Sequence, residues 1–487
     1  MTAFTQLREL THLTDLAQLP PVKRISDVTQ RARTQPWAQL KAGLNGLKAR
    51  VRSWSRMPQN PVTILAPLEH SKESRLRQLL EKIDQDTANN AILPFEKFGE
   101  KLHFARLLIL EGPDHPDTYA SSLVFLANVD GPVEDFLQQV VEVAAAGLDE
   151  VFGTCRDYPP KRQRTEATRR AFLQAHLVTD QAYYINTVGR TVRQIRQEDE
   201  LHRALRSFLN DLERPLQLNA KTMRQVLVDY VASRTELSWA LQPAERPGLL
   251  WRLKEELRFA LILAGGAVVV LWSWPVLALW LLNIDRLNRQ DDEDRVRPPL
   301  GRLTQLRARE DILVQNQFAA VGFVKPGWVR GVHTRALLAL GQVGFRHIFN
   351  KGDLATVPLL KLQGVNTIHF AHWIFIEDRQ RLLFASNYDG SLESYMVDFI
   401  DKVAWGINLV FSNGVGFPRT IKLVREGARK EQLYKDYLGN HQIETLAWHS
   451  PYPQLTAVNV ANNEAIRAGL RGYMTERQAR AWLRRIN

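Results

Sequence analysis

The sequence has only one cysteine, Cys155, among its 487 residues. An internal disulfide is therefore excluded, and a reducing compartment fits this composition. The first residues lack the apolar stretch of a secretory signal, so we expect a protein that stays on the cytoplasmic side. HExxH, CxxC, P-loop and dinucleotide-binding patterns are also missing, which disfavours a dedicated zinc site or a phosphate-binding loop.

Charge is missing from one long segment, Phe259–Ile284, which has 26 residues without a single charged side chain. About 20 apolar residues are enough to span a bilayer as a helix. However, tryptophans stand at the middle of the segment, where a span would place them far from the interface that they prefer. Pro275 follows them and is expected to kink the helix. Two arms of about 13 residues would each reach only roughly 20 Å, which is too short to cross the bilayer and return.

This uncharged segment predicts contact with a membrane. A single crossing would separate the two halves of the chain, so we favour a half-inserted helical hairpin or an interfacial helix pair. A true span with pairing between chains, and a buried helical pair packed on protein, remain as alternatives. The residues expected at the membrane are Phe259, Trp272, Trp274 and Trp280.

The positive charge is concentrated at the two ends of the chain. The net charge is +12, and residues 1–60 carry ten basic against three acidic residues. Residues 471–487 carry five basic residues and one acidic residue. Basic ends attract anionic lipid or nucleic acid, although solvated basic helices are the simpler interpretation. The sequence lacks basic–aromatic stripes of the kind that bind nucleic acid, so we expect an anionic membrane surface, or a second copy of the chain, as the partner.

An internal repeat is the strongest feature. Residues 123–159 match residues 382–418 without a gap, with 11 of 37 positions identical. Just upstream, Leu102–Arg106 aligns with Ile368–His372. Each copy shows the same order of patterns: an apolar strand, a helix, two strands joined by a turn, a second helix and a last strand.

These patterns predict an α+β fold made of two tandem ferredoxin-like β-α-β-β-α-β repeats that pair as an α/β-barrel, with added helices and an apolar helical hairpin. A single repeat leaves one face of its sheet uncovered, and two repeats can bury these faces against each other. The predicted organisation has five parts: a basic helical segment 1–58, repeat 59–215, a linker 216–310 that contains the uncharged segment, repeat 311–470, and a basic tail 471–487.

Two histidines occupy equivalent positions in the repeats. Strand alternation places His103 and Ala105 on one face, and Phe104 and Arg106 on the other. His369 is the counterpart of His103, so pairing of the repeats would bring both imidazoles near a pseudo-twofold axis. Two imidazoles there could ligate a metal or a haem, whereas a hydrogen-bonded core histidine is the alternative.

Two aspartates follow the second strand of each hairpin. Asp130 and Asp389 each precede a glycine, as expected in a tight turn between strand and helix. The carboxylate could act as an acid–base group or could accept from free helix amides. Arg106 is replaced by His372 in the second repeat. This difference indicates either that one half binds an anionic ligand or that a surface position has drifted between the two copies.

The tandem pattern with an Asp-Gly turn resembles the dimeric α/β-barrel superfamily, which includes dye-decolourising peroxidases that bind haem between a sheet and helices. Their pattern is Gly-x-x-Asp-Gly; here the Asp and the second Gly are present, but Ala127 and Ser386 replace the first Gly. Segments of the second repeat also resemble a group of uncharacterised bacterial membrane-associated proteins. They are Asn316-Gln317, Thr367–Ala371, Ser386–Gly390 and Gly416–Thr420.

This resemblance implies a haem-dependent peroxidase-like oxidoreductase, associated with the cytoplasmic face of a membrane as a peripheral or monotopic protein. Asp389 or Asp130 would be the distal acid–base group and Arg106 a distal charge. The axial ligand would be His369 or His347, with His103 and His372 as further cofactor-binding candidates. The alternative is a non-enzymatic lipid-binding or scaffold protein with no cofactor.

Overall fold

The computed structural model describes residues 57–112, 121–211, 218–245, 247–349 and 367–486. The predicted segment 1–58 lies outside them except for its last two residues. The described part is mixed helix and antiparallel sheet, as predicted. In the first half the elements are β1 (Gln59–Pro67), α2 (Glu73–Gln85), β2 (Leu102–Leu110), β3 (Ser122–Asp130), α3 (Val133–Val151), α4 (Glu166–Ala175), β4 (Ala182–Ile185) and α5 (Val192–Asp211). Three helices follow: α6 (Ala220–Ser233), α7 (Leu249–Gln290) and α8 (Leu300–Arg307).

The second half repeats this order. It consists of β5 (Gln315–Phe323), α9 (Trp328–His347), β6 (Ile368–Ile376), β7 (Arg381–Asp389), α10 (Leu392–Lys402), α11 (Ala404–Phe411), the short pair β8 (Thr420–Ile421) and β9 (Arg425–Glu426), α12 (Glu431–His441), β10 (Thr445–His449), α13 (Ala457–Gly469) and α14 (Glu476–Leu483). Short 3₁₀ helices lie between these elements, at His70–Lys72, Phe95–Lys101, Phe152–Thr154, Lys161–Gln163, Ser238–Leu241 and Gly427–Arg429.

The two four-stranded sheets exchange their last strands. Their orders are β1-β3-β2-β10 and β4-β6-β7-β5, so each repeat contributes its fourth strand to the sheet of the other repeat. Each hairpin would otherwise leave the edge of β2 or β6 without a partner, and an unpaired edge is unfavourable. The exchange was not expected, because the repeat pattern indicates four strands for each copy but not which edge the fourth strand joins.

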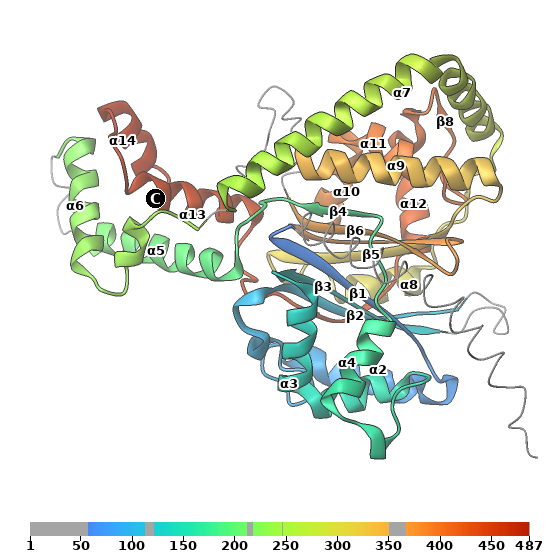
Figure 1. The fold of residues 1–487 in the computed structure, drawn as a ribbon, viewed down its shortest axis with the longest axis horizontal. Coiled ribbons are helices and arrows are strands. Elements are labelled where there is room, and N and C mark those ends of the chain that lie inside the picture. The colour runs from blue at the N-terminus through green and yellow to red at the C-terminus, as the bar shows by residue number, and fades with distance from the viewer. Residues whose placement is uncertain (1–56, 113–120, 212–217, 246, 350–366, 487) are drawn as a thin grey trace, which may run out of the picture. The chain divides into compact units, whose positions relative to one another are not determined.

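Apolar side chains form a layer between the two sheets and a further layer between each sheet and the helices on its outer side. Figure 1 shows α2, α3 and α4 on the outer side of the first sheet, and α9, α10, α11 and α12 on the outer side of the second. Apolar side chains from both sheets fill the space between them, among them Leu108, Leu126, Ile374 and Leu383. Backbone hydrogen bonds also bind an edge strand of each sheet to a segment that precedes an exchanged strand: Leu65 N of β1 donates to His176 O (3.0 Å), before β4, and Ile443 N, before β10, donates to Ala319 O of β5 (2.8 Å).

A β-bulge changes the direction of each repeated histidine. The register of β2 against β3 shifts just before Phe104, and β6 shifts in the same way against β7. The ring of His103 contacts Phe370 of the other sheet (5.1 Å between ring centroids), whereas Ala105 packs under the helices of its own half. The prediction that these two residues share a face is therefore wrong, because the extra residue of a bulge interrupts the period of two. Phe104 and Arg106 do share a face, as predicted: both reach the other sheet.

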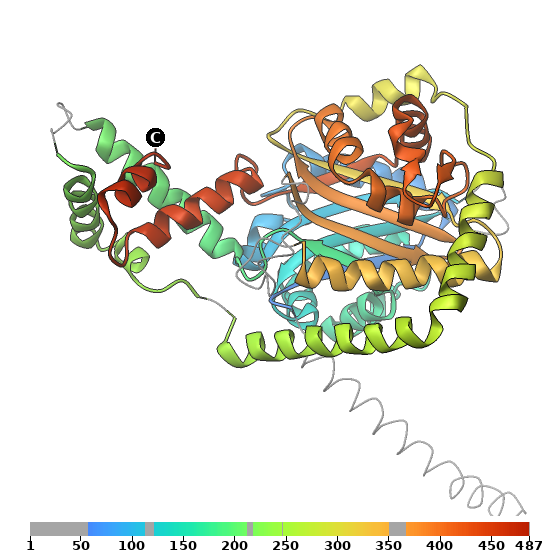
Figure 2. The same ribbon diagram turned by 90° about the horizontal axis from the view of Figure 1, so that it is seen from above.

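The last helices of both halves pack together with helices from outside the repeats. α5 and α13 lie side by side, and α6 packs on α14 (Figure 1, Figure 2). Residues 471–487, predicted as a basic tail, therefore include a packed helix. Trp482 of α14 is buried, and its indole N–H donates to the carbonyl oxygen of Ile466 (2.9 Å).

The uncharged segment forms part of one continuous helix, α7. The prediction of a helical hairpin is wrong: Pro275 lies inside the helix, and no turn interrupts it. Figure 2 shows α7 changing direction part-way along its length, as expected where a proline removes a backbone hydrogen bond. The alternative of a buried helical pair is also wrong, because the buried residues of α7 lie near its ends. They are Glu255, Phe259, Ile284 and Asn288.

Candidate functional site

Two equivalent His–Asp pairs lie at the same end of the two sheets. His103 Nε2 is 2.9 Å from Asp130 Oδ1, and His369 Nε2 is 2.7 Å from Asp389 Oδ1. All four side chains are buried. Since a carboxylate can only accept, each Nε2 carries the proton of the bond. The repeat thus produces the same pair twice, with each histidine in a bulge and each aspartate at the end of a strand.

Each aspartate also binds the first turn of a helix. Asp130 Oδ2 accepts from the backbone N–H of Val192 (2.9 Å), which opens α5, and Asp389 Oδ2 accepts from that of Ala457 (2.7 Å), which opens α13. A carboxylate at a helix N-terminus satisfies a free amide and complements the helix dipole. The predicted capping role is therefore present. The capped helix is the one after the fourth strand and not the helix that directly follows the turn.

Tyr452 connects the two halves of the site. Its hydroxyl is 2.8 Å from His103 Nδ1, and its ring lies 6.0 and 6.4 Å from the rings of His103 and His369. With Nε2 protonated, Nδ1 of a singly protonated ring accepts from the tyrosine hydroxyl. The sequence does not predict this contact, because Tyr452 reaches His103 only through the pairing of β10 with β2.

The space beside the two histidines is small. A cavity lined by both of them, with Asn186, Arg190 and Tyr452, has a volume of about 20 Å³. This is room for about one water molecule. Nothing larger than a water fits between the pairs without moving buried side chains.

Arg106 belongs to a different network, between the sheets. Its guanidinium donates to the carbonyl oxygens of Phe318 (2.7 Å) and Ser386 (2.6 Å) and to Asn387 Oδ1 (2.5 Å). Burial lowers the pKa of Arg106 to about 9, but the group remains charged at neutral pH. No carboxylate forms an ion pair with it in the described part of the chain. Arg106 thus holds the second sheet through neutral acceptors.

His372, the counterpart of Arg106 in the second sheet, contacts the first sheet in the same way. His372 Nε2 is 2.8 Å from Asn128 Nδ2, and its Nδ1 is 2.7 Å from Asp180 Oδ2. Asn387 in turn donates to Asn128 Oδ1 (3.1 Å), which links the two asparagines of the repeat. Arg106 and His372 are therefore buried connections between the sheets, and neither lies on an open surface where an anion could bind.

His347 stands apart from these networks. It lies at the end of α9, where its ring stacks on Phe259 of α7 (4.7 Å between ring centroids). Burial and the neighbouring Arg346 lower the pKa of His347 to about 4, so the ring is neutral at pH 7. Its Nε2 is buried and has no hydrogen-bond partner.

The described residues do not fit a haem at the predicted ligands. Both ring nitrogens of His103 and of His372 have partners, and Nε2 of His369 is bound to Asp389. The cavity at the His–Asp pairs has room for about one water, far less than a porphyrin needs. His347 has a free nitrogen, but Phe259 covers its ring. The described residues also include no group of three or more side chains that could hold a metal ion.

None of the protein-family models, curated proteins or solved structures compared with the chain matches it.

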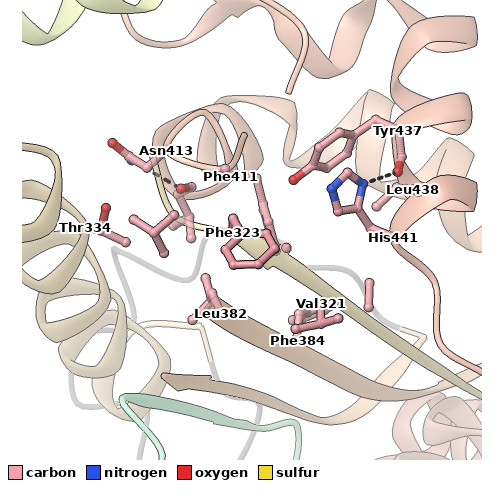
Figure 3. A pocket seen from close by; sticks show the side chains of 15 residues that line it. Val321, Phe323, Thr334, Leu382, Phe384, Phe411, Asn413, Tyr437, Leu438 and His441 are labelled. Atoms are coloured by element: carbon pink, nitrogen blue, oxygen red, sulfur yellow. Dashed lines mark hydrogen bonds between the residues drawn. The ribbon is translucent and has the colours of Figure 1, made fainter. Parts of the chain in front are cut away.

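A second cavity lies on the outer side of the second sheet. Figure 3 shows it between strands and helices, with mainly apolar side chains pointing into it. His441 stands at its edge, where its Nδ1 is 2.8 Å from the carbonyl oxygen of Tyr437. The volume of this cavity is about 30 Å³, which is far too small for a cofactor. The labelled apolar lining residues are Val321, Phe323, Leu382, Phe384, Phe411 and Leu438.

The His–Asp pairs are expected to stabilise the folded state. Replacing Asp389 with asparagine leaves one oxygen to serve either His369 or the amide of Ala457, so one buried partner loses its acceptor. We expect the free energy of unfolding to fall by about 1–3 kcal/mol. Asp130→Asn should have a similar effect through His103 and Val192. Urea unfolding followed by circular dichroism measures both; unchanged stability of both variants would contradict the structural role and favour an acid–base function.

Proposed function

We propose that this chain is a monotopic membrane protein: a non-enzymatic lipid-binding or scaffold protein that inserts α7 into one leaflet of a bilayer. The exposed surface of α7 is the observation that carries this proposal. It is the one described helix that is long and apolar enough to cross a membrane, and no residue of its most apolar window is buried inside the protein. In water this whole apolar surface would be exposed to solvent, which is unfavourable. Large contiguous apolar patches on a protein surface therefore mark interaction sites.

Both ends of the uncharged segment are attached to the same helix, α9. Near the start, both carboxylate oxygens of Glu255 accept from Arg346, at 2.7 and 2.8 Å. Near the end, Trp280 Nε1 lies 3.4 Å from His333 Nδ1, and Arg330 contacts Asn288. A segment held at both ends by one folded body cannot cross the bilayer with those contacts intact. Insertion from one side supports the monotopic arrangement.

The tryptophans fit the same arrangement. Trp272 and Trp274 are 88% and 64% exposed, and Trp328 of α9 is 73% exposed beside Trp280. In a crossing helix the central tryptophans would lie at the bilayer midplane. When the helix enters a single leaflet, its tryptophans can stay close to the headgroup region that they prefer.

The core supports a barrel made from paired ferredoxin-like repeats. The exchanged strands and the backbone bonds at both margins surround a shared interior, as in the dimeric α/β-barrel superfamily that the sequence resembles. That interior is filled by Arg106, Asn128, Asn387 and apolar side chains. We therefore favour the scaffold function over the haem-dependent peroxidase that the resemblance implies. The cytoplasmic face remains our proposal for the location.

Single cysteines test the orientation of α7. Cys155 is buried and can be replaced by serine, after which a cysteine is placed at Gly248, at Gln290 or at the exposed Val268. In sealed vesicles with the protein bound outside, a membrane-impermeant maleimide should label positions 248 and 290 and leave 268 unlabelled until detergent is added. Labelling of 248 and 290 from opposite sides would show a true span and overturn the monotopic arrangement.

A further inference from the structure

The first turns of α7 meet the last turn of α9 at a joint that combines charged and apolar groups. Glu255 is 3% exposed, and Arg346 binds it with two hydrogen bonds. The stack of Phe259 on His347 lies beside this ion pair. The joint stands where the charged part of α7 ends and the uncharged segment begins, which is the level at which a membrane-inserted helix meets lipid headgroups.

This joint has an excess of positive charge. Arg252 and Arg258 lie three residues before and after Glu255, on the same side of the helix. Arg346 already uses both oxygens of Glu255, and neither Arg252 nor Arg258 forms an ion pair with a carboxylate in the described part of the chain. Burial and the neighbouring Arg346 lower the pKa of Arg258, as expected where like charges share a site.

Two buried nitrogen atoms at the joint, Arg258 Nη1 and His347 Nε2, have no hydrogen-bond partner. The same is true of the buried Arg252 Nε, one turn earlier on α7. Leaving a buried donor unpaired costs about 1–3 kcal/mol, and more for a charged group. Since most buried polar groups in native proteins are paired, the two unpaired guanidinium nitrogens of Arg252 and Arg258 indicate an acceptor that comes from outside the chain.

We propose that Arg252 and Arg258 bind the phosphate group of an anionic phospholipid at the joint between α7 and α9. Phosphate oxygens accept from the planar fork of a guanidinium, and this geometry favours arginine over lysine. Exposed side chains beside the joint, Leu257 and Leu261, would contact the acyl chains of the same lipid. This apolar surround favours a lipid over free phosphate. The proposal rests on the proposed membrane function and names its ligand.

Vesicle flotation tests the site. The full chain is mixed with vesicles of phosphatidylcholine alone, or with vesicles that also contain phosphatidylglycerol. We expect the wild type to bind both and to prefer the anionic vesicles. The double variant Arg252→Gln/Arg258→Gln should lose this preference by about tenfold and keep its binding to phosphatidylcholine. An unchanged melting temperature shows that the variant is folded.

The matched control removes the same charge elsewhere. Arg477 on α14 and Arg484 just after it are exposed, and Figure 1 shows α14 away from α7, so Arg477→Gln/Arg484→Gln should leave the preference intact. An equal loss in the control would show diffuse attraction to the surface and overturn the site. Equal binding of the wild type to both vesicles would also overturn the site, while the membrane function stands. Binding to neither vesicle would overturn the membrane function itself.

A competition experiment with inorganic phosphate tests whether the site binds a lipid headgroup or a soluble anion. Inorganic phosphate at high concentration should weaken the preference of the wild type for anionic vesicles and should have no effect on the double variant. If phosphate raises the melting temperature of the wild type alone but leaves its vesicle preference unchanged, the site binds a soluble anion, and the lipid proposal is wrong.

Discussion

Replacing Val268, Leu271 and Leu279 with lysine is expected to release the protein from bilayers. These side chains are 57%, 74% and 68% exposed on α7, so the change removes no packing inside the protein. A lysine in the apolar part of a membrane helix costs about 2.5–3.5 kcal/mol in insertion experiments. Even with partial relief by snorkelling, the triple variant should lose at least about a hundredfold in vesicle partitioning. Flotation with phosphatidylcholine vesicles measures the loss.

The control for this experiment is lysine at exposed apolar positions outside α7. Val458 on α13 and Val397 on α10 are 57% and 39% exposed. Val458→Lys and Val397→Lys should partition like the wild type, because neither lies on the proposed membrane surface. Surface changes of this kind usually alter stability by no more than about 0.5 kcal/mol, so every variant should melt normally. Persistent binding of the triple lysine variant would show that α7 does not hold the protein on the membrane.

Replacing Arg106 with methionine is expected to lower the free energy of unfolding by about 3 kcal/mol or more. The side chain is 2% exposed, and its loss leaves the carbonyl oxygens of Phe318 and Ser386 without these donors. Each buried group without a partner costs about 1–3 kcal/mol. Removing a buried charge offsets part of this cost, since the charge itself is desolvated. Urea unfolding at neutral pH measures the difference.

Lysine at the same position separates charge from geometry. Arg106→Lys keeps a positive charge but lacks the planar fork that reaches two strands at once, so it should lose most of the same stability. Membrane partitioning of either folded variant should equal that of the wild type, because Arg106 lies between the sheets and not at α7. A methionine variant as stable as the wild type would contradict the structural role and return Arg106 to the distal function that the resemblance implies.

The local elements were readable from the sequence, because their patterns are local. In each copy, a strand, a helix, a hairpin, further helices and a last strand follow one another in the order that the patterns predict. The Asp-Gly turns are also a local property: Gly131 and Gly390 have φ values of +80° and +81°, which residues with a side chain rarely adopt. The predicted capping by Asp130 and Asp389 followed from their chemistry, but the helices that they cap begin 62 and 68 residues further along the chain.

The sequence by itself determined the repeat, the strands and helices within each copy, and a long uncharged segment that has to avoid water. Only the tertiary structure decided which edge each fourth strand joins, and with it that Tyr452 meets His103. The bulges decided where the two histidines point. The attachment of both ends of α7 to α9 is also a tertiary contact. Edge pairing and anchoring depend on residues far apart in the chain, and a periodic pattern carries no information about such contacts.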